Sequence, residues 1–102
     1  MSGLQLKRRG ERVKISGELT IYHATELKNE LRDLIDRGNG LLLDLSEVSE
    51  FDTAGFQVLA WARREAERRG LALRIEKPSA SVQQLFAAYR IDWLDRAVSV
   101  TI

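Results

Sequence analysis

The chain changes between two hydrophobic periods, and each change of period marks an expected element. Apolar and polar residues alternate on either side of Arg9-Gly10-Glu11, which predicts a short hairpin of two strands with one buried face. From about Tyr22 to Asp36 the apolar residues recur every three or four positions, which predicts an amphipathic helix. The recurring positions are Leu19, Ile21, Ala24, Leu27, Leu31, Leu34 and Ile35.

The second half of the chain repeats a strand followed by a helix. The continuous apolar run from Leu41 to Leu45 predicts a central strand covered on both faces, after which we expect a loop over residues 46–51. The helical period returns from Thr53 to Arg69. Its expected inward residues are Gly55, Val58, Leu59, Ala62 and Ala66.

Two strands and a third helix are expected toward the end of the chain. Residues 71–75 predict a strand. A helix is expected over residues 79–89, with inward residues Val82, Leu85, Phe86 and Tyr89. Alternation returns from Ala97 to Ile102, which is consistent with a last strand.

This order of elements, β-β-α-β-α-β-α-(β), predicts an α/β fold. We expect a mixed sheet whose parallel strands are joined by right-handed crossovers, with the helices packed against it. The chain has 102 residues, of which 44% are hydrophobic, so it is long enough for one domain with its own core. We therefore assign residues 1–102 to a single domain.

Composition narrows the possible functions. The 16 Lys and Arg residues nearly balance the 15 Asp and Glu residues, and a net charge of +1 favours neither a nucleic-acid partner nor a membrane surface. The absence of cysteine excludes disulfides and thiolate metal sites. The N-terminus lacks the pattern of a signal peptide, and no apolar run approaches the roughly 20 residues of a membrane span. We expect a cytoplasmic protein without direct membrane insertion.

The sequence lacks the residues that most kinds of catalytic site require. The sequence contains no glycine-rich phosphate-binding motif, and a catalytic triad or a multi-histidine metal site could draw only on His23, which we expect to be a surface or capping residue. The arginines late in the second helix complement the helix dipole. We expect no catalytic residue, no metal and no cofactor, and hence no enzyme; a small enzyme or nucleotide-binding domain is the weaker alternative.

One short stretch concentrates the polar chemistry. Asp44 is expected at the end of the buried strand, and Asp52 and Thr53 stand where the next helix begins, so all three are expected at one edge of the sheet, where open α/β sheets often place functional sites. Asp52 or Thr53 can cap the helix, and Gly55 can allow close packing on the sheet. Alternatively, the Thr53 hydroxyl is a phosphorylation target, at which a phosphate adds about 1.5 to 2 negative charges.

The stretch DLSEVSEFDTAG, residues 44–55, resembles the signature of the STAS family, which comprises anti-sigma factor antagonists and their relatives. Two further segments are similar to that family. ISGELTIYHATELKNEL resembles its second strand and first helix, and GLALRIEKPSASVQQLFAAYRIDWL resembles its fourth strand and the helix that follows. The resemblance thus covers nearly the whole chain and implies a STAS-like mixed sheet.

The resemblance also implies a mechanism. In this family the hydroxyl residue at the position of Thr53 accepts phosphate from a partner serine/threonine kinase of the anti-sigma class, with Asp44, Ser46, Asp52 and Gly55 as neighbours. The unphosphorylated antagonist binds its anti-sigma factor and frees a sigma factor, and the phosphorylated form does not bind. Other members act beside chemotaxis-type signalling proteins. As an alternative, some are cytoplasmic subunits of lipid-transporting ABC systems that dock on the ATPase without phosphorylation.

The second helix offers candidate partner-binding residues. Phe56 and Trp61 are expected at the two flanks of its inward stripe, next to the polar residues Gln57 and Arg64. Large aromatic side chains beside arginine are frequent interface anchors. The alternative is that both rings cover the edges of the core.

Overall fold

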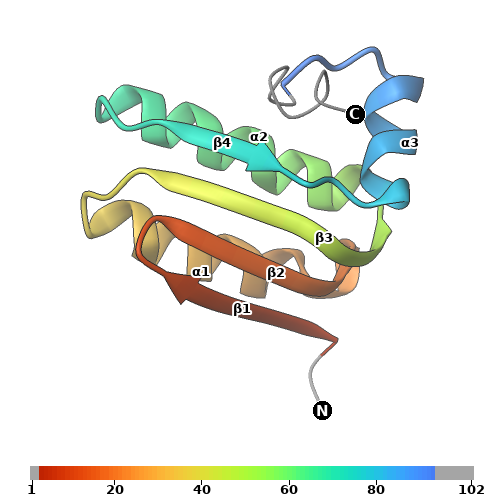
Figure 1. Ribbon diagram of the computed structural model, residues 1–102, viewed down its shortest axis with the longest axis horizontal. Coiled ribbons are helices and arrows are strands. Elements are labelled where there is room, and N and C mark those ends of the chain that lie inside the picture. Colours follow the sequence, from red (N-terminus) through yellow and green to blue (C-terminus); the bar gives the residue numbers. More distant parts are fainter. Residues whose placement is uncertain (1–2, 94–102) are drawn as a thin grey trace.

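The elements follow the expected order in a computed structural model, which describes residues 3–93 (Figure 1). A β-hairpin leads through a short 3-10 helix, η1, to an alternation of helices and strands. The elements are β1 (Leu4–Arg9), β2 (Arg12–Leu19), η1 (Ile21–His23), α1 (Ala24–Asp36), β3 (Leu41–Phe51), α2 (Thr53–Arg68), β4 (Leu73–Glu76) and α3 (Ala80–Ala88). The last strand that we expected, over residues 97–102, lies outside the described residues.

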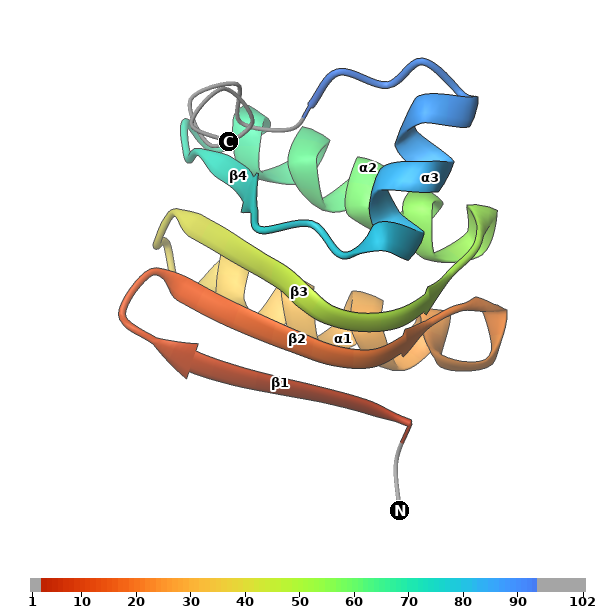
Figure 2. The same cartoon turned by 45° about the vertical axis from the view of Figure 1, so that its right-hand side comes forward.

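The strands form one mixed sheet, as predicted. Its order is β1-β2-β3-β4, with β1 antiparallel to β2, and with β2, β3 and β4 mutually parallel. Helices α1 and α2 lie side by side on one face of this sheet, and α3 packs near the end of β3 (Figures 1 and 2). The predicted α/β class is thereby confirmed.

Strand β3 is longer than the sequence pattern indicated. It continues from Leu41 through Phe51, so the loop expected over residues 46–51 was wrong. The register with β2 shifts twice along this stretch, and each shift places one extra residue in β3. Such bulges interrupt the alternation of inward and outward residues, which is why the sequence around Ser46 looked like a loop.

The core lies between the sheet and the two long helices. Leu27, Leu31 and Ile35 of α1 and Leu59 and Ala62 of α2 are buried against the inward side chains of the strands. Two residues depart from the expected pattern. Helix α1 begins at Ala24, so Ile21 precedes it and is 68% exposed instead of inward, and Tyr89 caps the end of α3 with 59% of its surface exposed.

The first turn of α2 lies directly against the end of β2. A Cβ atom added to Gly55 would overlap the backbone carbonyl of Leu19, whose strand is fixed by its neighbours on both sides. Gly55 has no unusual backbone torsion, so the glycine is required by space and not by conformation.

We predict that Gly55→Ala destabilises the fold, although alanine is the better helix former by about 1 kcal/mol. The overlap with Leu19 must be relieved by moving α2, and overpacking of this kind costs about 1 to 3 kcal/mol. Urea unfolding measures the free energy. Gly38→Ala is the comparison, because Gly38 has open space around it and a φ of +83°, so that only backbone strain is added. A stabilised Gly55→Ala variant would contradict the packing argument.

Candidate functional site

The carboxylate of Asp52 joins two elements at one end of the sheet. Asp52 is the N-cap of α2, and its Oδ1 accepts a hydrogen bond from the Gly55 amide at 2.9 Å. Its Oδ2 accepts a second bond from the Ile21 amide of η1 at 3.0 Å. The Asp52 amide donates to the Leu19 carbonyl at 3.3 Å. The start of α2 is therefore tied to β2 and η1 through one side chain.

Thr53 follows as the first residue of α2, and its side chain is exposed. Because Asp52 supplies the cap, the Thr53 hydroxyl is not needed for that purpose. The amides of Gly55 and Phe56 are satisfied by the Asp52 side chain and carbonyl, respectively. The amides of Thr53 and Ala54 make no hydrogen bond within residues 3–93, so they are the ones that a helix-terminal anion would meet.

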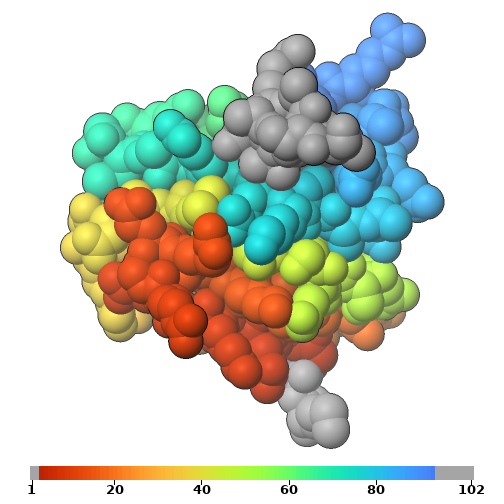
Figure 3. All heavy atoms as spheres, viewed as in Figure 1, coloured from red at the N-terminus to blue at the C-terminus, as the bar shows by residue number. Residues whose placement is uncertain are grey.

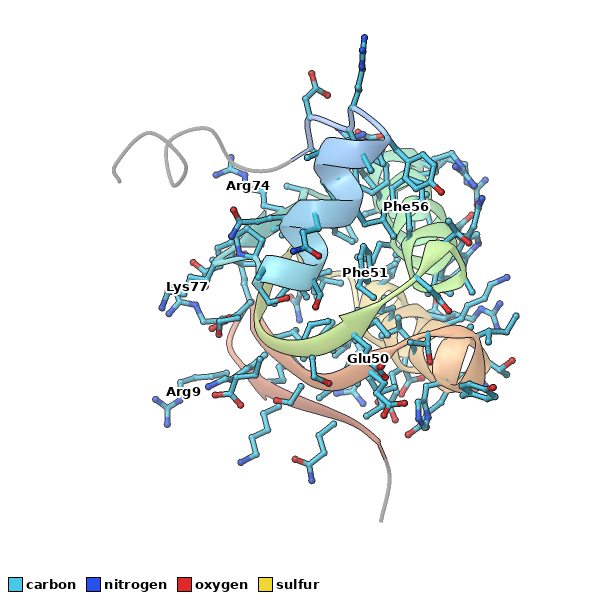
Figure 4. All side chains as sticks on the ribbon, turned by 90° about the vertical axis from the view of Figure 1, so that its right-hand side faces the viewer. Arg9, Glu50, Phe51, Phe56, Arg74 and Lys77 are labelled. Carbon is cyan, nitrogen blue, oxygen red and sulfur yellow. The ribbon has the colours of Figure 1, made fainter. Side chains whose placement is uncertain are left out.

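An acidic groove of about 630 Å³ borders this helix start. Its lining includes the carboxylates of Glu18, Glu50 and Asp52, and no lysine or arginine of residues 3–93 lines it. Glu50 and Phe51, at the end of β3, can be seen there (Figure 4). The groove residues are Glu18, Thr20, Tyr22, Ser49, Glu50, Phe51, Asp52, Ser81, Gln84 and Leu85. New negative charge near Thr53 would thus add to a surface that is already acidic.

Two large apolar side chains beside the groove were missed by sequence reasoning. Ile21 is 68% exposed and Tyr22 is 86% exposed, and both belong to η1, whose backbone Asp52 holds. The sequence carried no separate signal for them, because Ile21 fits the helical spacing to Ala24 and η1 is too short to have a period of its own.

His23 occupies the last position of η1. It stands at the N-cap of α1, yet its side chain makes no capping hydrogen bond. Its two ring nitrogens lie 3.8 Å from a Glu18 carboxylate oxygen and 3.6 Å from one of Glu26. The ring therefore sits between two acids at the rim of the groove.

Asp44 and Ser46 do not join this site, contrary to our expectation. Strand β3 continues from Asp44 to Phe51, directly before Asp52, which separates the two aspartates by a distance on the order of 20 Å. Asp44 is 6% exposed, and its carboxylate accepts hydrogen bonds from the Ser46 amide and hydroxyl at 2.9 and 2.7 Å. Burial raises the pKa of Asp44, but the two bonds from Ser46 and the charges of Lys77 and Lys14 outweigh it and lower that pKa below 3.8.

The aromatic residues of α2 have partners within the fold. Phe56 stacks on Trp93, with ring centroids 5.0 Å apart, and meets the edge of Phe86 at 5.9 Å. On the opposite flank, the Trp61 ring lies beneath Lys28 and Arg32 of α1 at 4.9 and 5.3 Å. Both rings thus cover the edges of the core, which was the alternative interpretation.

Gln57 and Arg64 lie on the same side of α2 as Thr53 and are exposed. Their part in binding a partner stays a prediction.

Two kinds of site are absent from the part of the chain that the structure describes. Residues 3–93 contain no group of three or more His, Asp or Glu side chains arranged to hold a metal ion. Over the same range, none of the helices combines the length and the apolar character that a membrane span requires.

Three comparisons with known proteins find relatives of the same kind. A family model described as "Mlab, STAS domain" matches residues 2–96. The anti-sigma-B factor antagonist of Bacillus subtilis (strain 168) is 31% identical over 74 residues, which make up 72% of this chain and 68% of that protein. The unphosphorylated anti-sigma factor antagonist SpoIIAA superposes with a TM-score of 0.72 at 21% identity, covering 90% of this chain and 85% of that one. The phosphorylated Bacillus SpoIIAA gives 0.68 at 19% identity, with coverages of 97% and 99%.

We predict that Asp52→Ala lowers the free energy of unfolding by about 2 kcal/mol, because it removes the helix cap and the bond to Ile21 together. Asp52→Ser retains a capping oxygen for the Gly55 amide but has only one acceptor atom. We expect it to lose about half as much, as measured by urea unfolding. A stability of Asp52→Ala equal to that of the wild type would refute the bridging role.

A second prediction concerns pH. Because the pKa of Asp44 is lowered in the folded state, its contribution to stability is fully present above pH 3.8 and is lost as the pH falls through the folded pKa. Asp44→Asn keeps the shape and an acceptor for Ser46 but does not titrate. The unfolding free energy of the wild type should therefore decline more steeply than that of the variant between about pH 5 and pH 2. Parallel declines would show that other groups govern the acid response.

Proposed function

The chain belongs to the STAS domain family, and we propose that it is a non-enzymatic cytoplasmic regulator of the anti-sigma factor antagonist type, with Thr53 as a phosphorylation switch. The observation that carries this proposal is the fixed position of Ile21 and Tyr22 beside Thr53. One carboxylate, that of Asp52, hydrogen-bonds the backbone of both elements. A binding surface and a modifiable hydroxyl are thereby held together.

Exposure of the two η1 side chains supports protein binding. Single exposed apolar residues are common on protein surfaces, but Ile21 and Tyr22 are adjacent, and Tyr22 lines the groove. The bond between Asp52 and the Ile21 amide fixes their backbone before any partner arrives. Such preorganisation reduces the ordering entropy that binding must offset. Tyrosine is also a frequent anchor at the centre of interfaces.

Phosphate on Thr53 would alter this surface without dismantling it. Within residues 3–93 the amides of Thr53 and Ala54 make no hydrogen bond and can donate to a phosphate, and the Thr53 hydroxyl makes none that modification must break. The added charge of about −1.5 to −2 would stand next to Asp52 and the other acids of the groove. A partner that binds Ile21 and Tyr22 would have to desolvate that charge, which weakens its binding. In this scheme the partner is an anti-sigma factor or kinase, or a related signalling protein.

A second candidate function is a cytoplasmic subunit of a lipid-transporting ABC system, which docks on the ATPase without phosphorylation. The family model that matches the chain bears the description "Mlab, STAS domain", which favours this candidate. The exposed Thr53 hydroxyl would then serve as a contact residue. This function predicts stable association with the ATPase whatever substituent Thr53 carries.

The switch is tested with variants of Thr53 and the anti-sigma-class kinase encoded nearest to this chain in its genome. We expect Thr53→Glu to weaken binding at least about tenfold, a loss of 1.4 kcal/mol or more, and Thr53→Ala to bind like the wild type, as measured by isothermal titration calorimetry. Mass spectrometry after incubation with the kinase and ATP should place one phosphate on Thr53. Equal affinity of all three proteins, with no phosphate incorporated, would remove the switch and favour the transporter subunit.

The binding surface is tested separately with an Ile21→Ser/Tyr22→Ser double variant. The two side chains are exposed in the free protein and would be buried by the partner. Their loss should weaken partner binding by at least about tenfold, because burying one such side chain fully contributes roughly 1.5 to 3 kcal/mol. Tyr89→Ser is the matched control, since Tyr89 is also an exposed tyrosine but lies at the end of α3. Equal weakening by Tyr89→Ser, or none by the double variant, would place the interface elsewhere.

A further inference from the structure

One face of the sheet carries no helix from the described residues 3–93. Helices α1 and α2 both lie on the other face, and within residues 3–93 no element crosses the open one (Figures 1 and 2). Parallel strands such as β2, β3 and β4 are usually covered on both faces. Here the outward side chains are mainly charged, so this face is built for contact with water or with a polar partner.

Positive charge is concentrated on this open face. The strand pairing places Lys7 directly opposite Lys14, and Arg9 directly opposite Arg12. Arg74 of β4 points outward between the buried residues Leu73 and Ile75. Arg9, Arg74 and Lys77 project from the side opposite to α1 and α2 (Figure 4). We call this surface the basic face, and its residues are Lys7, Arg9, Arg12, Lys14, Arg74 and Lys77.

The acids of this face neutralise only part of its charge. Arg12 forms an ion pair with Glu76 at 2.7 Å, and Lys14 forms one with Glu47 at 2.8 Å. Asp44 is buried and accepts two hydrogen bonds from Ser46, and its charge also attracts Lys14 and Lys77. The remaining cations make no ion pair within the described part of the chain, and they are Lys7, Arg9, Arg74 and Lys77.

The arrangement also disfavours folding. Like charges directly opposite each other on neighbouring strands are destabilising, and the β1–β2 hairpin contains two such pairs in succession on one face. Charged residues do protect an edge strand such as β1 from aggregation. Alternating signs across the hairpin would protect it equally well without repulsion. The uniform sign therefore points to an anionic ligand.

We propose that the basic face binds an acidic, extended segment of a partner protein. Adjacent strands place the cations in rows about 4.8 Å apart, so a segment lying across the sheet meets several of them. None of the six basic-face residues is aromatic, so they offer no ring on which nucleic-acid bases would stack, and the outward residue between Arg12 and Arg74 is the apolar Leu42. Insertion into a membrane needs exposed apolar side chains, whereas the outward side chains of this face are mainly charged. Figure 3 shows this face, with β1 and β2 in red and orange next to β4 in teal.

This binding surface is separate from the Thr53 end of the molecule. The basic face is centred on the β1–β2 hairpin, whereas the groove is lined by residues at the far ends of β2 and β3 and by α3. The inference therefore goes beyond the proposed function, and neither depends on the other.

The test uses a fluorescein-labelled peptide of ten glutamates, with binding followed by fluorescence anisotropy at low ionic strength. We expect the wild-type protein to bind it and Lys7→Gln/Arg9→Gln to weaken binding by more than about twofold and up to about thirtyfold, since two exposed ion pairs at roughly 0.2 to 1 kcal/mol each contribute roughly 0.4 to 2 kcal/mol together. The control is Arg37→Gln/Arg68→Gln, which makes the same change in net charge on α1 and α2 and should leave the dissociation constant within about twofold.

Thermal unfolding tests whether the variants are as stable as the wild type. Because Lys7→Gln/Arg9→Gln relieves repulsion, its melting temperature should not fall below that of the wild type; if it does, Arg74→Gln alone gives the decisive binding comparison. Equal weakening in both double variants would reduce the effect to net charge and overturn the proposal. So would failure of the peptide to bind, or tighter binding of phosphatidylglycerol vesicles or of a ten-nucleotide thymidine strand, either of which would assign the face to another class of ligand.

Discussion

The close approach of α2 to the end of β2 determines where everything at the candidate site lies. Gly55 allows the helix backbone to rest on the Leu19 carbonyl, and any larger residue would push the helix away. A second contact depends on the first. The Asp52 side chain can accept from the Ile21 amide only while the end of β2 and the start of α2 touch. Thr53 consequently faces solvent beside η1, and the Asp52 side chain supports both the helix cap and the proposed binding surface of Ile21 and Tyr22.

The sequence alone predicted the order of the elements and the start of α2, but it did not predict the length of β3. Strong periodic patterns identified both long helices, and the Asp52-Thr53 pair marked the beginning of α2 correctly. Bulges are different, since an extra residue in one strand is stabilised by the neighbouring strand and leaves only a broken alternation in its own sequence. Asp44 was misplaced for this reason. A strand that was assumed to end near Leu45 continued and carried Asp44 away from Thr53.

The flanks of α2 show a second limit of local reasoning. A helical wheel correctly placed Phe56 and Trp61 at opposite sides of the inward stripe, but it contains no information about what lies next to each flank. Phe56 is covered by Phe86 and Trp93, which come from a later part of the chain, and Trp61 by two cations of α1. Conversely, η1 is too short to have a period, so the exposure of Ile21 and Tyr22 followed only from the tertiary structure.

A net charge near zero concealed two surfaces of opposite sign. The acidic groove lies at the Thr53 end of the sheet, and the basic face extends from the β1–β2 hairpin across the open side of the sheet to Arg74 and Lys77. Arg12 precedes Leu19 by seven residues along β2, a separation on the order of 20 Å, whereas charges in physiological salt are screened within about 8 Å. A phosphate on Thr53 would therefore change the potential of the groove and leave that of the hairpin nearly unaltered. One small domain could in this way release one partner while retaining another.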